Sequence, residues 1–142
     1  MEEVSASLRV PRDLCDGLAL RYRISLEEVR RGTTWLGAAV CIGELLFLTA
    51  WLAHMGNGAL SRTRVVRLEK HLRYAVTVGK QKGKLYLSAN AFREFVELME
   101  THERQLASSP IALLHEGMRL MDSYRHEGVV TPERLQRSEH GV

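Results

Sequence analysis

The sequence has little of what marks a secreted or metal-binding protein. It contains two cysteines, Cys15 and Cys41, and neither lies in a Cys-x-x-Cys or other metal-ligand spacing. We therefore expect a reduced, cytoplasmic protein rather than a disulfide-bonded secreted one. The first ten residues, MEEVSASLRV, carry two acids and no apolar run, so we expect no signal peptide.

Linker-forming residues are also scarce. Three prolines, no long Ser/Gly tract and no internal repeat leave little room for a flexible linker. With 142 residues, 45% of them apolar, the chain is long enough to build one domain around its own core. We expect a single domain over 1–142. It comprises an arm at 1–40, a helical core at 41–128 with a basic helix and hairpin at 61–88, and a polar tail at 129–142.

The sequence lacks a recognisable catalytic or metal centre. The stretch GKQKGK departs from the phosphate loop, because three residues instead of four separate its glycines and Leu85 replaces the required hydroxyl. His115 and His126 are eleven residues apart and could share a helix face, but no third ligand accompanies them. We therefore expect no enzyme activity, no metal site and no cofactor.

One long apolar run, residues 35–53, raises the question of a membrane span. It holds 19 residues with a single charge, Glu44, near its centre, which is close to the length that crosses a bilayer. A charge at that depth costs about 2.5 to 3.5 kcal/mol on insertion. Basic residues flank both ends of the run: Arg30, Arg31, Arg62 and Arg64. We expect a central helix buried on most sides, with a membrane-anchored interaction protein as the alternative.

Positive charge is concentrated in residues 61–84. This stretch holds eight Lys and Arg residues and one acid, for a net charge of +7, whereas the remaining 12 basic and 16 acidic residues sum to −4. The eight are Arg62, Arg64, Arg67, Lys70, Arg73, Lys80, Lys82 and Lys84. Such a concentration is typical of a surface that binds a polyanion, and a solvated basic face is the alternative.

The N-terminal part of the chain predicts a strand and two helices. Apolar and polar residues alternate over 4–10, which is typical of a half-buried strand, and Pro11 ends it. Apolar residues at 14, 18 and 22 predict a helix over 12–23. Ser25 and Glu28 form the pattern S-x-x-E, a capping box. It predicts a second helix that begins at Ser25 and runs into the apolar run, with a break near Gly32.

The pattern in the rest of the chain predicts three more helices and a hairpin. Ser61 is placed to cap a helix with apolar residues on one side and the arginines on the other. The stretches YAVTV and KLYLS flank GKQKG and predict a hairpin with Lys80, Lys82 and Lys84 at its tip. A helix over 89–107 follows. Ser109 and Pro110 then predict the start of the last helix, which Gly128 ends.

The predicted fold class is therefore mainly α: a helical bundle of about five helices with an N-terminal strand and one short β-hairpin. Four acids follow the outer side of the helix at 89–107, namely Glu94, Glu97, Glu100 and Glu103. A row of this kind is typical of a solvated helix face, and a basic surface on a neighbouring subunit is the alternative contact.

The opening stretch SASLRVPRDLCDGLA, followed by a helix start at Ser25, resembles the ribbon-helix-helix DNA-binding fold of the Arc and MetJ repressors. The resemblance implies that two chains pair their strands into a ribbon whose outward side chains, here Ser5, Ser7 and Arg9, read bases. It also implies that the backbone around Ser25 and Leu26 holds a phosphate. An edge strand that leads into a core helix is the alternative. LALRYRISLEEVRR also resembles a helix-turn-helix, but its second helix opens with acids.

In size, helix content and charge, the chain is also similar to the helical small subunit of multi-subunit CRISPR surveillance complexes. That resemblance implies that basic residues of the helix and hairpin bind backbone phosphates without reading bases. We therefore expect a non-enzymatic protein that binds DNA or RNA and self-associates or assembles with other subunits. A DNA-binding regulator is the first interpretation, and a ribonucleoprotein subunit is the alternative.

Overall fold

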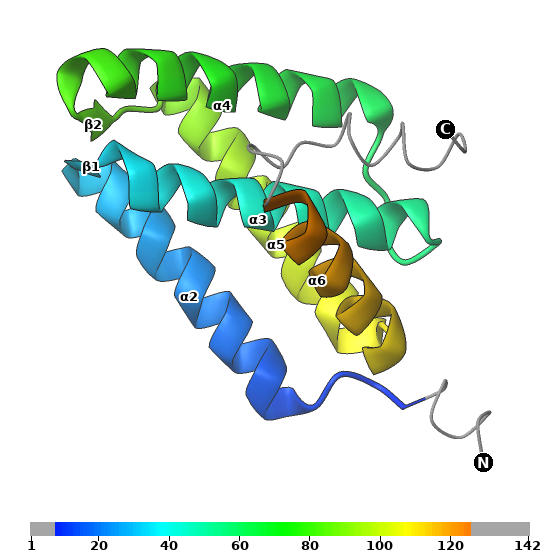
Figure 1. The fold of residues 1–142 in the computed structure, drawn as a ribbon. Coiled ribbons are helices and arrows are strands. Elements are labelled where there is room, and N and C mark those ends of the chain that lie inside the picture. Colours follow the sequence, from blue (N-terminus) through cyan, green and yellow to red (C-terminus); the bar gives the residue numbers. More distant parts are fainter. Residues whose placement is uncertain (1–7, 126–142) are drawn as a thin grey trace.

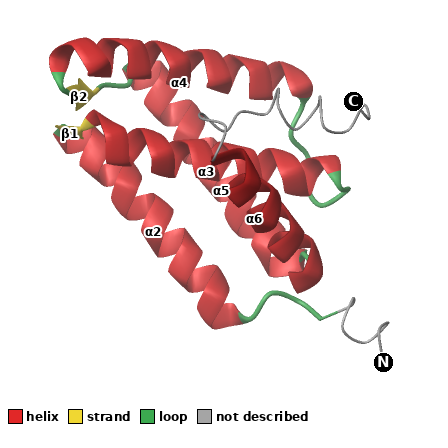
Figure 2. Ribbon diagram, viewed as in Figure 1, coloured by secondary structure: helices red, strands yellow, loops and turns green. Residues whose placement is uncertain are grey.

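The structure, a computed structural model, describes residues 8–125. Within that range, five helices surround one core and two short strands pair at one end (Figures 1 and 2). The helices are α2 (Arg12–Arg31), α3 (Trp35–His54), α4 (Arg62–Lys82), α5 (Ala89–Ser108) and α6 (Ile111–Arg125), and the strands are β1 (Thr33–Thr34) and β2 (Lys84–Leu85). The predicted fold class, mainly α with about five helices and a short antiparallel β element, is confirmed, although the two strands are not those of the predicted hairpin.

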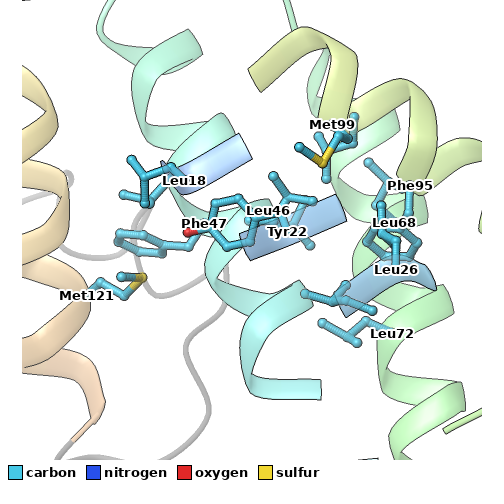
Figure 3. Packing of buried hydrophobic residues seen from close by; sticks show 14 of the residues in the cluster. Leu18, Tyr22, Leu26, Leu46, Phe47, Leu68, Leu72, Phe95, Met99 and Met121 are labelled. Atoms are coloured by element: carbon cyan, nitrogen blue, oxygen red, sulfur yellow. The ribbon is translucent and has the colours of Figure 1, made fainter. Parts of the chain in front are cut away.

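α3 is the centre of the fold. It packs against α2, α4, α5 and α6, and residues 44–52 are buried at every position, so side chains cover this part of the helix on all sides. Figure 3 shows apolar side chains from all five helices meeting around it, among them Leu46 and Phe47. The predicted buried central helix is confirmed.

By length and composition, α3 is also the one helix in residues 8–125 that could cross a membrane, and 61% of its most apolar window is buried inside the protein.

The acid inside this apolar helix is paired with a residue of the preceding helix. Glu44 is 2% exposed, and its Oε2 lies 2.7 Å from Nη2 of Arg21 on α2. Burying a carboxylate without a partner costs several kcal/mol. The ion pair therefore explains how α3 carries a charge in its buried part, and it fixes α2 alongside α3.

α2 is one continuous helix, so the predicted helix start at Ser25 is wrong. Ser25 lies in the helix interior and is buried, together with Tyr22 and Leu26. This side packs against α3 and α5, and its burial favours an unbroken helix where the S-x-x-E pattern alone predicts a boundary. The predicted break at Gly32 is confirmed. Gly32 ends α2 with a φ of 89°, a conformation that favours glycine.

The first described residues pair with the junction between α5 and α6. Arg9 forms an isolated antiparallel bridge with Pro110. The Val10 amide donates to the Ser109 carbonyl at 3.2 Å, and the Ile111 amide donates to the Leu8 carbonyl at 2.8 Å. Most of the strand predicted over 4–10 lies outside the described residues, as do Ser5 and Ser7.

The hairpin predicted around GKQKG is wrong. α4 begins at the predicted cap, where Ser61 Oγ accepts from the Arg64 amide at 3.2 Å, but it continues through 74–78 to Lys82. Gly83 then ends it in the left-handed conformation. The strand that follows, β2, pairs with β1 instead of folding back on its own neighbour, so that Thr33 lies opposite Leu85.

The last two helices agree with their predicted positions except at the cap. α5 covers Ala89–Ser108, close to the predicted 89–107. Ser109 does not cap α6, because its hydroxyl donates back to the Gln105 carbonyl at 2.6 Å. α6 begins at Ile111, and the predicted stop at Gly128 lies outside the described residues.

Candidate nucleic-acid interface

α4 lies along one edge of the bundle and turns one side to α3 (Figure 1). The buried residues of that side follow helical spacing: Val65, Leu68, Leu72, Ala75 and Gly79. The contact is closest at Gly79, where a Cβ would lie 2.7 Å from Cβ of Trp35. Because small residues allow this approach, the whole 21-residue helix can follow α3, and its other side is left facing outward.

The structure gathers the predicted cations onto this helix. Seven of the eight lie on α4, and Lys84 lies on β2 just beyond it. All have exposed side chains except Arg64, which is half-buried. At about 100° per residue, Arg62, Arg73 and Lys80 fall within about 20° of one another, and Lys70 lies about 80° from Arg62. Lys80 and Lys82 therefore belong to the last turn of a helix, and the predicted hairpin tip does not exist.

Three of the arginines form ion pairs within the chain. Arg67 Nε lies 2.5 Å from Oε1 of Glu94, whose Oε2 is also 2.8 Å from Nε2 of His71. Arg64 lies 3.5 Å from Glu97. Arg73 Nη2 lies 2.5 Å from Oε1 of Glu69, four residues earlier on α4, and the Arg73 side chain is 58% exposed. In two of these pairs the carboxylate is largely buried, with the Glu94 side chain 14% and the Glu69 side chain 8% exposed. Because a buried carboxylate is costly without its partner, Arg67 and Arg73 are less available to phosphates than an unpaired cation.

The acidic row on α5 meets arginines of the same chain. Glu94 and Glu97 face α4, and Glu103 pairs with Arg23 of α2 at 2.5 Å. Glu100 is exposed. The row is therefore neither wholly solvated nor left entirely for a neighbouring subunit, because three of its four members contact basic side chains within the fold.

Five cations have no ion pair with any residue in 8–125. They are Arg62, Lys70, Lys80, Lys82 and Lys84. Nζ of Lys80 lies over the Trp35 ring, 5.9 Å from the ring centroid. We refer to these five residues, together with Arg73, as the α4 basic face. All six residues are exposed.

The helix dipole explains only part of this charge. Cations stabilise the last turn of a helix and are unfavourable in the first. Lys80 and Lys82 stand in the last turn of α4, where they stabilise the helix. Arg62 and Arg64 stand in the first turn, which contains no acid. Helix stability therefore does not account for these arginines. Arg64 pairs with Glu97 of α5, and Arg62 has no such pair in residues 8–125.

The base-reading residues implied by the ribbon-helix-helix resemblance lie far from this face in the chain. Ser5 and Ser7 are outside the described residues. Arg9 is exposed, and its guanidinium donates to the Ser108 carbonyl. Ser25 and Leu26 are buried inside α2, so their backbone does not form the free helix N-terminus that the resemblance places at a phosphate.

Two exposed apolar side chains on α4 were not among the predicted site residues. Tyr74 is 73% exposed and Val66 is 40% exposed, and both lie on the outward side with Lys70. The sequence signal for Tyr74 was its position four residues after Lys70. The interpretation of 74–78 as a strand concealed that spacing.

Within residues 8–125, no three His, Cys, Asp or Glu side chains are grouped to hold a metal ion. His115 is exposed on α6, and His126 lies outside the described residues.

Comparison of the chain with known protein families, curated proteins and solved structures found no match.

Proposed function

We propose that this protein binds nucleic acid without catalysing a reaction, and that the α4 basic face contacts the phosphate backbone. The observation that supports this most directly is the set of five exposed cations that have no ion pair in the described chain. Three of them, Arg62, Lys70 and Lys80, lie along about 27 Å of α4, since each helical residue rises about 1.5 Å. That length matches about eight base-pair steps of duplex.

Contact with the backbone is favoured over reading of bases. Lysine and arginine neutralise phosphates without regard to sequence, and the α4 basic face consists of such residues. Arg9, the described member of the predicted base readers, donates to the carbonyl of Ser108. The function we propose is thus what the two family resemblances have in common, nucleic-acid binding, in its sequence-independent form. Self-association is part of the same proposal, because a single short face gives few phosphate contacts.

The test is the salt dependence of binding. We expect wild-type protein to bind a 30-nucleotide oligomer with a log Kd that rises steeply with log salt concentration. Replacing Arg62, Lys70 and Lys80 by Gln should lower that slope by about 2 to 3, because each lost phosphate contact contributes about 0.7 to 0.9. Gln preserves helix propensity. Sedimentation of the same samples reports the oligomeric state.

A matched control removes three charges elsewhere. Arg12, Arg104 and Arg119 are exposed on α2, α5 and α6, and replacing them by Gln gives the same net charge as the first variant. The proposal is contradicted if both triple variants lower the slope equally, because the effect would then follow net charge alone. It is also contradicted if the wild-type protein binds anionic lipid vesicles and no nucleic acid.

A further inference from the structure

We infer that the α4 basic face binds single-stranded nucleic acid and that Tyr74 stacks against an unpaired base. This inference rests on the proposed function and adds the strand state of the ligand. It is carried by the position of one aromatic ring among the cations of α4.

Tyr74 contributes little to the fold. Its side chain is 73% exposed, the largest value among the exposed large apolar residues of the described chain. It makes no ring contact or hydrogen bond with another residue in 8–125. Tyrosine also forms helices less readily than the Lys, Arg or Gln that an outward position usually carries. Neither packing nor helix propensity therefore explains an aromatic ring at this position.

The neighbours of Tyr74 are cations. Lys70 lies one turn before it on the same side of α4, Arg73 is adjacent in the chain, and Arg67 lies two turns before it. Arg67 and Arg73 are exposed but pair with the largely buried carboxylates of Glu94 and Glu69, whereas Lys70 has no ion pair with a described residue. A ring that extends from such a surface is next to the phosphates whenever a strand lies along α4.

This combination fits a single strand better than a duplex. Proteins that bind single strands combine a positive surface with aromatic side chains on which bases stack. In a duplex the base faces are hidden in the stack, and only groove edges and phosphates are accessible. On a duplex, Tyr74 could therefore make contact only through its hydroxyl. In an unpaired strand the ring face and the adjacent cations act together, the ring on a base and the cations on the flanking phosphates.

Val66 is a second exposed apolar side chain on the outward side of α4. It is 40% exposed and lies two turns before Tyr74, at a spacing of eight residues that keeps both on the outward side. Apolar contact with a second base is the role that this position allows. The face therefore alternates charge with apolar surface, as a strand alternates phosphates with bases.

The experiment compares four probes: a 30-nucleotide oligo-dT, the corresponding oligo-U, a 30-base-pair duplex, and heparin, a polyanion without bases. We expect Tyr74→Ser to weaken binding to oligo-dT or oligo-U by about 5- to 150-fold, the range that corresponds to 1 to 3 kcal/mol per stacked base. Binding to duplex and to heparin should change less than twofold, and the salt slope should stay the same. The two single strands distinguish DNA from RNA.

Two further variants separate stacking from other effects. Tyr74→Phe keeps the ring and removes the hydroxyl, so it should retain wild-type affinity. Leu20→Ser removes another exposed apolar side chain, on α2, and should change no affinity. Loss of binding in Tyr74→Phe equal to that in Tyr74→Ser would overturn stacking in favour of a hydroxyl contact with phosphate.

The proposed function and this inference fail in different ways. If no nucleic acid binds with a salt slope that depends on the α4 basic face, the proposed function is wrong. If that slope is found but Tyr74→Ser binds every probe as the wild type does, or if duplex is bound more tightly than both single strands, the inference alone is wrong.

Discussion

At the scale of single residues, His102 is the most unusual group in the core. It is fully buried on α5, and neither ring nitrogen has a hydrogen-bond partner among the described residues. Tyr22 packs against it edge-on, with the ring centroids 5.5 Å apart. Burial lowers the pKa of His102 to about 4, and the nearby Gln105 partly opposes that shift. The folded protein therefore holds this histidine neutral at pH values where an unfolded chain protonates it.

This burial predicts sensitivity to acid. Between pH 6.5 and about 4, the unfolded chain binds a proton at His102 and the folded chain does not. The contribution of neutral His102 to the free energy of unfolding is therefore fully present above pH 6.5. It is lost as the pH drops through this window, by about 3 kcal/mol in total. We expect His102→Leu to lose less of its free energy of unfolding than the wild type when urea titrations at pH 7 and pH 4 are compared. His115→Gln, at an exposed site, is the control. Parallel losses in wild type and His102→Leu would contradict the prediction.

At the scale of elements, glycine has opposite roles in α2 and α4. A Cβ on Gly79 would lie 2.7 Å from Trp35 Cβ and 3.3 Å from the Lys84 carbonyl oxygen. A Cβ on Gly17 of α2 would meet nothing within 4 Å. Gly79 therefore permits a helix contact, whereas Gly17 only makes its helix more costly to form.

Alanine substitutions at Gly79 and Gly17 should change the free energy of unfolding in opposite directions. Gly79→Ala should lower the free energy of unfolding by about 1 to 3 kcal/mol, because it forces α4 away from Trp35. Gly17→Ala should raise it by about 0.5 to 1 kcal/mol, because alanine restricts the unfolded chain and suits a helix. Urea unfolding of both variants measures the difference. Equal effects of the two substitutions would show that α4 does not pack on Trp35 as described.

The contact between Gly79 and Trp35 also shows why some elements could be predicted from the sequence and α4 could not be predicted to its end. α3 and α5 were predicted almost to their ends, because an unbroken apolar run and a strong helical stripe mark them. Residues 74–78 were assigned to a strand because YAVTV and KLYLS flank the turn-like stretch GKQKG. The structure makes them helical because Ala75 and Gly79 continue the buried stripe of Leu68 and Leu72. Small residues at helical spacing carried that signal, and it becomes decisive only when Trp35 is placed against Gly79.

The candidate site was predictable in composition and not in arrangement. The concentration of cations in 61–84 is visible in the sequence, and so is the Glu69–Arg73 pair, which has the favourable i,i+4 spacing. The pairs of Arg67 with Glu94 and of Arg64 with Glu97 join residues that only the packing of α4 beside α5 brings together. Three-dimensional contacts therefore decide which of the predicted cations remain available.

At the scale of the whole molecule, charge is distributed unevenly over the surface. Residues 61–84 carry a net +7 and the rest of the chain −4, and the structure assigns the positive part to one edge helix and the strand beyond it. An uneven distribution of this kind steers a polyanion to one side of the molecule at low salt.

The central position of α3 bears on how the protein unfolds. Each of the other four helices covers part of α3, so exposing it requires all of them to leave and removes the shared core. The amides of Leu45 to Leu48 lie in the part of α3 that is buried at every position. We expect these amides to exchange with deuterium only through complete, cooperative unfolding, with an opening free energy equal to the global value, whereas those near the start of α2 exchange through local fraying. Native-state exchange at low denaturant would measure this, and faster exchange at Leu45–Leu48 than at the buried residues of α5 would show that the molecule opens in separate parts.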